Sequence, residues 1–235
     1  MAGSGFGTNF RITTWGETHG AGVGVVVDGC PAGLPLERED VQKYLDRRKP
    51  GQSKYTTQRK EGDQVEILSG IFEGRTTGTP ISMVVYNKDQ RSKDYSNIKD
   101  IYRPGHADFT FDMKYGFRDY RGGGRSSGRE TIGRVAAGAV AAKVLKELGI
   151  EIKAYAKAIA GIEVSKDHFD FAEMNNNPFN MPDKEAAKLV QEKADQMIKE
   201  MDSIGGIIEC QITGMPVGIG ETVFDKLDAE LSKAI

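Results

Sequence analysis

The feature that most constrains the fold is an alanine-rich apolar stripe in the middle of the chain. Between Glu130 and Leu148, apolar residues recur every three or four positions, the spacing of one face of an α-helix. Gly149 follows directly and is a common stop for a helix. Small residues such as Gly138 allow a neighbouring backbone to approach closely. The sequence therefore predicts a long helix that packs tightly against other elements.

Short β-branched runs lie on both sides of this helix. They predict strands at about 8–14, 22–28, 64–71, 81–86, 151–162 and 207–213. Most are separated by Gly or Pro, which favours hairpins over parallel crossovers. Two more helices are predicted, at 37–47 and from Pro182 at the first helical position to about Met201. The second should bury Ala186, Leu189, Val190, Ala194, Met197 and Ile198. Residues 224–235 begin another helix without a stop signal.

Composition excludes several classes of protein. The chain has 235 residues, 38% of them hydrophobic, and a net charge of -2, unlike a disordered tail or a whole-surface nucleic-acid binder. Its two cysteines cannot form a disulfide framework. No signal peptide and no run of about 18 apolar residues is present. We therefore expect a cytoplasmic protein with no membrane or nucleic-acid partner.

Arginine is confined to one part of the chain. All 13 arginines lie between Arg11 and Arg134. The guanidinium fork matches phosphate and carboxylate oxygens, so this clustering indicates an anion site, with ordinary surface charge as the alternative. Two stretches concentrate the charge. Residues 46–60 indicate a basic loop that either holds a phosphate or is solvated, and residues 119–131 place glycines, serines and arginines before the long helix, as in an anion-binding helix N-terminus.

Two of the three histidines lie in glycine-flanked loops. His19 and His106 are candidate general acids, because imidazole can give up a proton near neutral pH, although either could be structural. His168 has no glycine or arginine nearby and is assigned a structural role. Residues 20–24 match part of a dinucleotide fingerprint, but a strand-like run follows, so a Rossmann site is rejected. No metal-ligand spacing is present.

Taken together, these loops resemble the chorismate synthases. The resemblance rests on four segments in order: Gly16-Glu17-Thr18-His19-Gly20, Arg47-Arg48-Lys49-Pro50-Gly51, Arg103-Pro104-Gly105-His106-Ala107-Asp108 and Arg121-Gly122-Gly123-Gly124-Arg125-Ser126-Ser127-Gly128-Arg129-Glu130-Thr131. It also takes in Ser69-Gly70-Ile71-Phe72-Glu73-Gly74 and Asp202-Ser203-Ile204-Gly205-Gly206. Four long motifs in the right order identify the chain as a member of this family.

The resemblance implies an α+β fold, a β-α-β sandwich with helices between antiparallel sheets, assembled as a homotetramer. It implies a lyase of the shikimate pathway that converts the small molecule 5-enolpyruvylshikimate-3-phosphate to chorismate by anti-1,4-elimination. The reaction uses reduced FMN without net redox change, and NADPH is a candidate reductant. Family members continue past residue 235, so residues 1–235 are expected to be one domain truncated at its C-terminal end. A module that binds FMN or a phosphorylated ligand without turnover is the alternative.

The same resemblance implies roles for individual residues. His106 would be the acid near the departing phosphate, and His19 would protonate or hold the reduced flavin. The substrate's phosphate and carboxylates would be held by Arg48, Lys54, Arg103 and Arg129, and FMN would be contacted by Arg125, Ser126 and Ser127. Lys54 stands where many members have arginine, and it keeps the charge but loses the fork. Gly128 stands where many have alanine.

Overall fold

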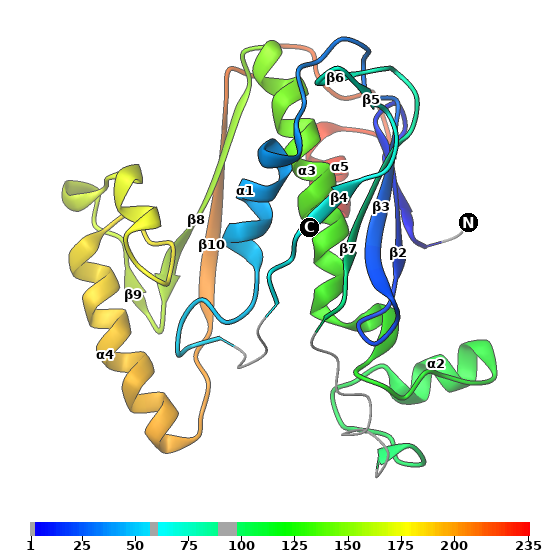
Figure 1. The fold of residues 1–235 in the computed structure, drawn as a ribbon. Coiled ribbons are helices and arrows are strands. Elements are labelled where there is room, and N and C mark those ends of the chain that lie inside the picture. Colours follow the sequence, from blue (N-terminus) through cyan, green and yellow to red (C-terminus); the bar gives the residue numbers. More distant parts are fainter. Residues whose placement is uncertain (1–2, 57–60, 89–97) are drawn as a thin grey trace. The chain divides into compact units, whose positions relative to one another are not determined.

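The computed structural model describes residues 3–56, 61–88 and 98–235 (Figure 1). The chain divides into two compact units, residues 1–144 and 145–235. Within the described ranges, no helix has the length and apolar character needed to cross a membrane.

The first unit is built on a five-stranded antiparallel sheet in the order β1-β2-β3-β7-β4. The strands are β1 (Gly5–Phe6), β2 (Arg11–Gly16), β3 (Gly22–Asp28), β7 (Ile81–Tyr86) and β4 (Val65–Ile67). β3 and β7 are rich in β-branched residues, which suit a pleated, buried surface. Every neighbouring pair in the sheet is antiparallel, as predicted. The predicted hairpins hold for β1-β2 and β2-β3, whereas β7 pairs with β3 and β4 across longer connections that contain other elements.

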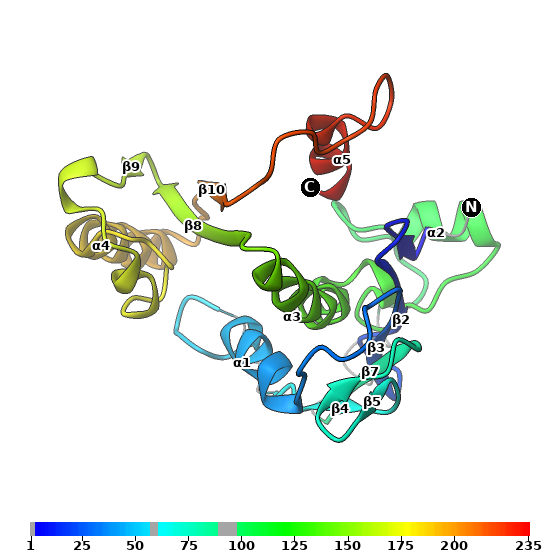
Figure 2. The same ribbon diagram turned by 90° about the horizontal axis from the view of Figure 1, so that it is seen from above.

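Two helices, α1 (Arg38–Arg48) and α3 (Thr131–Glu147), cover one face of this sheet (Figures 1 and 2). They share one hydrophobic core with the valines of β3. α3 lies so close to β2 and β3 that a Cβ atom on Gly133 would be 2.9 Å from Thr14 Cγ2. The predicted alanine-rich helix is therefore confirmed as a buried element, but the close approach expected at Gly138 is wrong, because a Cβ atom there would meet nothing within 4 Å. Its predicted last apolar position, Leu148, lies beyond the helix and is 67% exposed.

Smaller elements fill the connections of this unit. They are β5 (Ile71–Phe72), β6 (Arg75–Thr76), α2 (Asp108–Tyr115) and two 3₁₀ turns, η2 (Gly124–Ser126) and η3 (Gly128–Glu130). The single strand predicted at 64–71 is wrong, because the backbone turns at Gly70, which has φ +82°, and separates β4 from β5. β1 and α2 were not predicted.

The second unit has a three-stranded antiparallel sheet in the order β10-β8-β9. Its strands are β8 (Glu151–Ile159), β9 (Ile162–Glu163) and β10 (Gly206–Thr213). α4 (Lys184–Glu200) packs on this sheet through a small core that includes Ala156, Met181 and Val190. The remaining elements are the 3₁₀ turns η4 (Lys166–His168) and η5 (Phe171–Asn175) and the last helix α5 (Leu227–Ala234).

Three sequence predictions for this unit are wrong in detail. Pro182 is not the first helical residue, because the Asp183 carboxylate caps the helix by accepting from the N–H groups of Glu185 and Ala186. Leu189 and Ile198 were expected to be buried, but each is 53% exposed. The strand predicted at 151–162 is divided into β8 and β9 by a turn whose residues have positive φ.

Candidate active site

Antiparallel strands bring several connections to one end of the five-stranded sheet. β2 ends there at Gly16, β3 begins there at Gly22, and Gly22 pairs with Tyr86 at the end of β7. Val65, the first residue of β4, pairs with β7 one position before Tyr86. The connections that leave or enter these strands therefore meet at this end, although they are far apart in the sequence.

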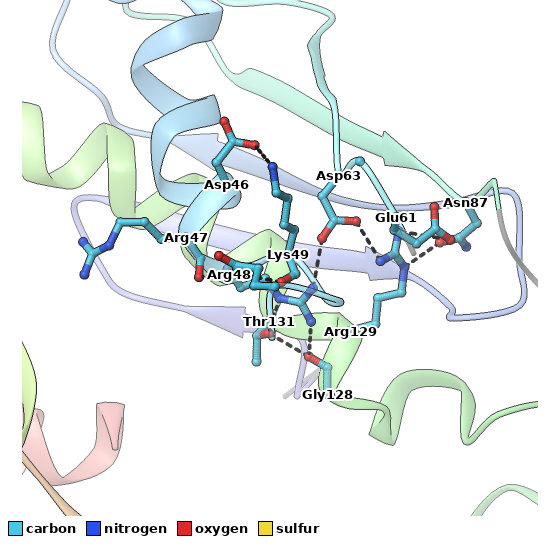
Figure 3. Close-up of polar contacts among 12 residues, drawn as sticks. Asp46, Arg47, Arg48, Lys49, Glu61, Asp63, Asn87, Gly128, Arg129 and Thr131 are labelled. Atoms are coloured by element: carbon cyan, nitrogen blue, oxygen red, sulfur yellow. Dashed lines mark hydrogen bonds and ion pairs between the residues drawn. The ribbon is translucent and has the colours of Figure 1, made fainter. Parts of the chain in front are cut away.

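Arg48, the last residue of α1, ties two helix ends together at this place (Figure 3). Its Nε donates to Thr131 Oγ1 at 3.1 Å, and its Nη2 donates to the Gly128 carbonyl at 3.0 Å. The C-terminus of α1 is thus fastened to the N-terminus of α3. The basic loop predicted at 46–60 begins three residues too early, because Asp46, Arg47 and Arg48 are still helical, and its residues 57–60 lie outside the described ranges.

The Asp63 carboxylate lies between two arginines from different parts of the chain (Figure 3). Its Oδ2 accepts from Arg48 Nη1 at 3.0 Å, and its Oδ1 accepts from Arg129 Nη1 at 2.8 Å. The Asp63 side chain is 0% exposed and that of Arg129 is 5% exposed. Buried charges persist only when they are paired. The structure therefore brings together Arg48 and Arg129, two of the four predicted substrate ligands.

Arg129 has a buried donor that the protein does not use. Its Nη2 lies 3.9 Å from Glu61 Oε1, which is too far for a hydrogen bond. Within the described ranges, Nη2 has no hydrogen-bond acceptor. An unmade hydrogen bond at a buried donor is costly. An anionic oxygen from a bound molecule would remove this cost.

Asn87 connects Arg129 to the loop that carries His19. Its side-chain oxygen accepts from Arg129 Nε at 2.7 Å. Its amide nitrogen donates to the carbonyls of Glu17 at 3.0 Å and Gly20 at 2.9 Å. One amide side chain therefore holds both the guanidinium group and the backbone turn around His19.

His19 itself is buried against the glycine triplet that precedes α3. The residue is 6% exposed, and a Cβ atom on Gly122 would lie only 2.3 Å from its Cδ2. The neighbouring Thr18 hydroxyl donates to the Gly124 carbonyl at 3.4 Å. Only a residue without a side chain fits beside this imidazole, so His19 and the triplet form one packed unit next to Arg129.

The three predicted flavin contacts fit a cofactor unequally. Arg125 donates to Thr14 Oγ1 at 2.7 Å and to the Gly16 carbonyl at 3.1 Å, so its guanidinium group holds β2. Ser126 is exposed and its hydroxyl donates to the Gly123 carbonyl at 2.7 Å, so its oxygen can still accept. Ser127 accepts from the Arg129 N–H, and its hydroxyl proton can be donated to a bound group. The serines, beside a glycine backbone with positive φ, fit a group rich in phosphate or hydroxyl oxygens. Arg125 fits a structural role better.

Like Arg125, Glu130 uses its charge to bind neighbouring groups of the protein. Burial alone would raise the pKa of its carboxyl, but hydrogen bonds from Thr14 and Arg134 hold that pKa below its usual range. Glu130 therefore stays ionised as an acceptor for the residues that surround the start of α3.

His106 and Lys54 take no part in the contacts described so far for this cluster. His106 is exposed, and its Nδ1 lies 3.2 Å from the Pro104 carbonyl. Lys54 is exposed, with its Nζ 5.1 Å from the centre of the Tyr55 ring. The structure thus places both side chains at the surface of the first unit.

Arg103, the fourth predicted substrate ligand, is held by a carboxylate. Its Nε and Nη2 donate to the two oxygens of Asp108, each at 2.9 Å, and its backbone N–H donates to Asp108 as well. Arg118 Nε lies 3.8 Å from the same carboxylate. This clamp closes the turn that carries His106. Hydrogen bonds from Arg103 hold the pKa of Asp108 at about 2.

We expect the stability of the first unit to fall as the pH drops from about 4 to 2. The pKa of Asp108 in the folded state, about 2, is below its ordinary value of 3.8. The ion pair therefore contributes fully above pH 4 and is lost as the pH falls through 2, by on the order of 1–2 kcal/mol. Urea unfolding at a series of pH values would measure this loss.

Asp108→Asn should flatten that part of the pH curve, whereas Asp28→Asn, which removes an exposed partner of Arg11, should leave it unchanged. An equal pH dependence in the parent and in Asp108→Asn would show that the Arg103 clamp contributes nothing.

The sequence analysis missed the acidic and amide groups of the site: Glu61, Asp63, Asn87 and Asp108. A signal for two of them was present, because Glu61 and Asp63 directly follow the basic stretch at 46–60 and could have been expected to neutralise it. Within the described ranges, no group of three His, Cys, Asp or Glu side chains could hold a metal ion.

Comparison with known proteins finds relatives over the whole chain. Two curated relatives named chorismate synthase, from Lachnospira eligens and Agathobacter rectalis, are 69% and 63% identical over the whole chain. The chain spans 64% of the length of each. A crystal structure of chorismate synthase matches with a TM-score of 0.71 and 31% identity, covering 91% of this chain and 61% of that one. The predicted α+β fold class is confirmed by this match and by the mixed helices and antiparallel sheets.

The sequence model of the family "Chorismate synthase" matches residues 10–235. This range includes both units and every residue of the cluster around Asp63. The chain belongs to the chorismate synthase family.

Proposed function

We propose that the protein acts as a lyase on 5-enolpyruvylshikimate-3-phosphate and forms chorismate and inorganic phosphate. The observation that carries this proposal is the convergence of Arg48 and Arg129 on Asp63, with a buried Arg129 donor that lacks an acceptor in the described part of the chain. A substrate with one phosphate and two carboxylates offers the oxygens that guanidinium groups bind best. Family membership supports the same reaction.

In the proposed reaction, the C–O bond between the ring and the phosphate breaks, and its electron pair leaves with phosphate. The ring hydrogen is lost in net terms as a proton to solvent, and the C–H electron pair stays in the ring to form the new C=C bond. Arg48 and Arg129 bind the anionic groups and orient the ring, and Lys54 and Arg103 contribute further positive charge. His106 gives a proton to the departing phosphate. Reduced FMN, when bound beside Ser126 and Ser127, supplies electron density that helps phosphate to leave. In this proposal, His19 holds or protonates that cofactor.

The proposal extends to the setting of the reaction. NADPH is the proposed reductant of the flavin, the homotetramer is the proposed assembly, and the cytoplasm is the proposed location. No nucleic acid or membrane takes part. The named relatives support the enzyme over a module that binds ligands without turnover.

An anaerobic assay with reduced FMN and 5-enolpyruvylshikimate-3-phosphate tests the activity. It should be run on these 235 residues and on a chimera that adds the part of the Lachnospira eligens relative that this chain does not match. We expect chorismate and phosphate in equal amounts from the chimera. A folded chimera that binds flavin and substrate but makes no chorismate would support the binding module instead.

We expect Arg48→Ala in the active chimera to raise KM by about 10- to 100-fold with little change in kcat. A charge-assisted contact to a phosphate or carboxylate is worth roughly 1.5–3 kcal/mol and acts on substrate and transition state alike. Steady-state kinetics would measure the split. Arg11→Ala, which removes an exposed guanidinium, is the matched control. An unchanged KM in Arg48→Ala would assign Arg48 a purely structural role.

A further inference from the structure

Asp63 combines a fully buried carboxylate with a strained backbone. Its φ is +43°, a region that residues other than glycine rarely adopt, and its side chain is 0% exposed. Such strain persists only where the surrounding structure imposes it, and it concentrates at functional sites. The residue is thus held in one orientation at a conformational cost.

Gln42 on α1 holds the backbone that directly follows Asp63. Its Nε2 donates to the Asp63 carbonyl at 3.2 Å, and its Oε1 accepts from the Val65 N–H at 3.0 Å. The side chain of Gln42 therefore spans Gln64 and ties the Asp63 carbonyl to the start of β4. The position of Asp63 therefore depends on both α1 and β4.

The Asp63 carboxylate lies between two guanidinium groups that would otherwise repel each other. Arg48 reaches one carboxylate oxygen from the end of α1, and Arg129 reaches the other from the turn before α3. Each carboxylate oxygen accepts from one arginine, so the carboxylate fixes Nη1 of both guanidinium groups, while Thr131 and Asn87 hold their Nε atoms (Figure 3).

We propose that Asp63 is a positioning residue that orients Arg48 and Arg129 so that both can bind one anionic group of the substrate. The identity of that substrate rests on the proposed function, but the positioning of an anion site does not. A competing account treats Asp63 only as a negative charge that lowers the affinity for anions. The two accounts predict changes of opposite sign when the charge is removed.

Asp63→Asn is the decisive variant. Asparagine has nearly the same size and tolerates positive φ, but it presents an NH₂ donor to one arginine, which must then turn away. We expect the affinity of the 235-residue chain for inorganic phosphate to fall about tenfold or more, through loss of one charge-assisted contact. A parallel titration with acetate tells whether the site prefers phosphate or carboxylate. Asp28→Asn, with its exposed Arg11 partner, should leave both affinities unchanged.

A spectroscopic readout reports the arginines directly. In the parent, the Nε–H protons of Arg48 and Arg129 are hydrogen-bonded and should exchange slowly with water in NMR spectra. In Asp63→Asn, at least one of the two should exchange faster. In the active chimera, the variant should raise KM far more than it lowers kcat.

Asp63→Glu keeps the charge but moves the carboxylate, and it decides the question if Asp63→Asn does not fold. We expect weaker phosphate binding in this variant also. The proposal is overturned if either folded variant binds phosphate as tightly as the parent does, or more tightly. It is also overturned if neither the parent nor the variant binds phosphate. If the parent chimera formed no chorismate while the Asp63 variants bound phosphate more weakly than the parent, the proposed reaction would be refuted and the positioning role of Asp63 would remain.

Discussion

Replacing His106 by alanine in the active chimera should lower turnover by about 10²- to 10⁴-fold while KM stays nearly unchanged, as expected for loss of a general acid. Nδ1 of His106 faces the Pro104 carbonyl, which can only accept, so the proton on this nitrogen is committed. In the protonated ring, the proton on Nε2 is then the one that can be transferred. The exposed side chain and the turn clamped by Arg103 and Asp108 suit this role.

The measurement is the dependence of kcat on pH for the parent and for His106→Ala. The kcat of the variant should lie far below that of the parent at every pH, while KM stays close to that of the parent. His168→Ala, which removes an exposed histidine of the second unit, is the control and should behave as the parent does. Turnover of His106→Ala within a few-fold of the parent would show that another group supplies the proton.

Gly122→Ala should destabilise the first unit by roughly 2–5 kcal/mol and displace His19. Gly122 has φ +65°, where an L side chain costs about 1–2 kcal/mol. The new methyl group would also lie 2.3 Å from His19 Cδ2 and 2.5 Å from Nε2, and such overpacking costs about 1–3 kcal/mol. Urea unfolding would measure the stability, and the NMR shifts of His19 would report the displacement.

Two neighbouring glycines separate the causes of this effect. Gly123 has φ +91°, but its nearest potential contact is 3.5 Å away, so Gly123→Ala should show the backbone cost without the clash. Gly138 lies within α3 with open space around it, and Gly138→Ala should stabilise by about 0.5–1 kcal/mol. If Gly122→Ala and Gly123→Ala lost equal stability and left His19 in place, the packing of His19 against the triplet would be refuted.

Elements with a strong local pattern are predictable from the amino-acid sequence. The spacing of Ile132, Ala136 and Val140 is enough to indicate α3, and the valine run at Val25 is enough to indicate β3. Boundaries are harder to predict where a side chain competes with a backbone preference. Proline favours the first turn of a helix, but the carboxylate of Asp183 satisfies two N–H groups and sets the start two residues later.

The residues of the candidate site also differ in how well the sequence predicts them. The glycine-flanked histidines and the arginine-rich loops could be identified from the sequence as candidates, and the family resemblance then indicated His19, Arg48 and Arg129 individually. Asp63 and Asn87 could not be identified, because their importance comes from pairings across the fold rather than from neighbours in the chain. Nothing local distinguishes a buried carboxylate that holds two arginines from a solvated surface acid.

The long sequence separation between partners at the sheet end has a consequence for how the molecule is made. Arg48 and Thr131 are 83 residues apart, Asp63 and Arg129 are 66 apart, and Gly16 and Arg125 are 109 apart. A nascent chain that stops before Thr131 contains Asp63 and Asn87 but lacks the helix that completes their contacts. Such distant pairings form late, after burial of the core has offset the entropy lost in loop closure. During translation, we therefore expect the five-stranded sheet to be completed only after α3 has been synthesised and has docked. Until then, its apolar face and the charged groups that α3 pairs with are accessible to chaperones and proteases.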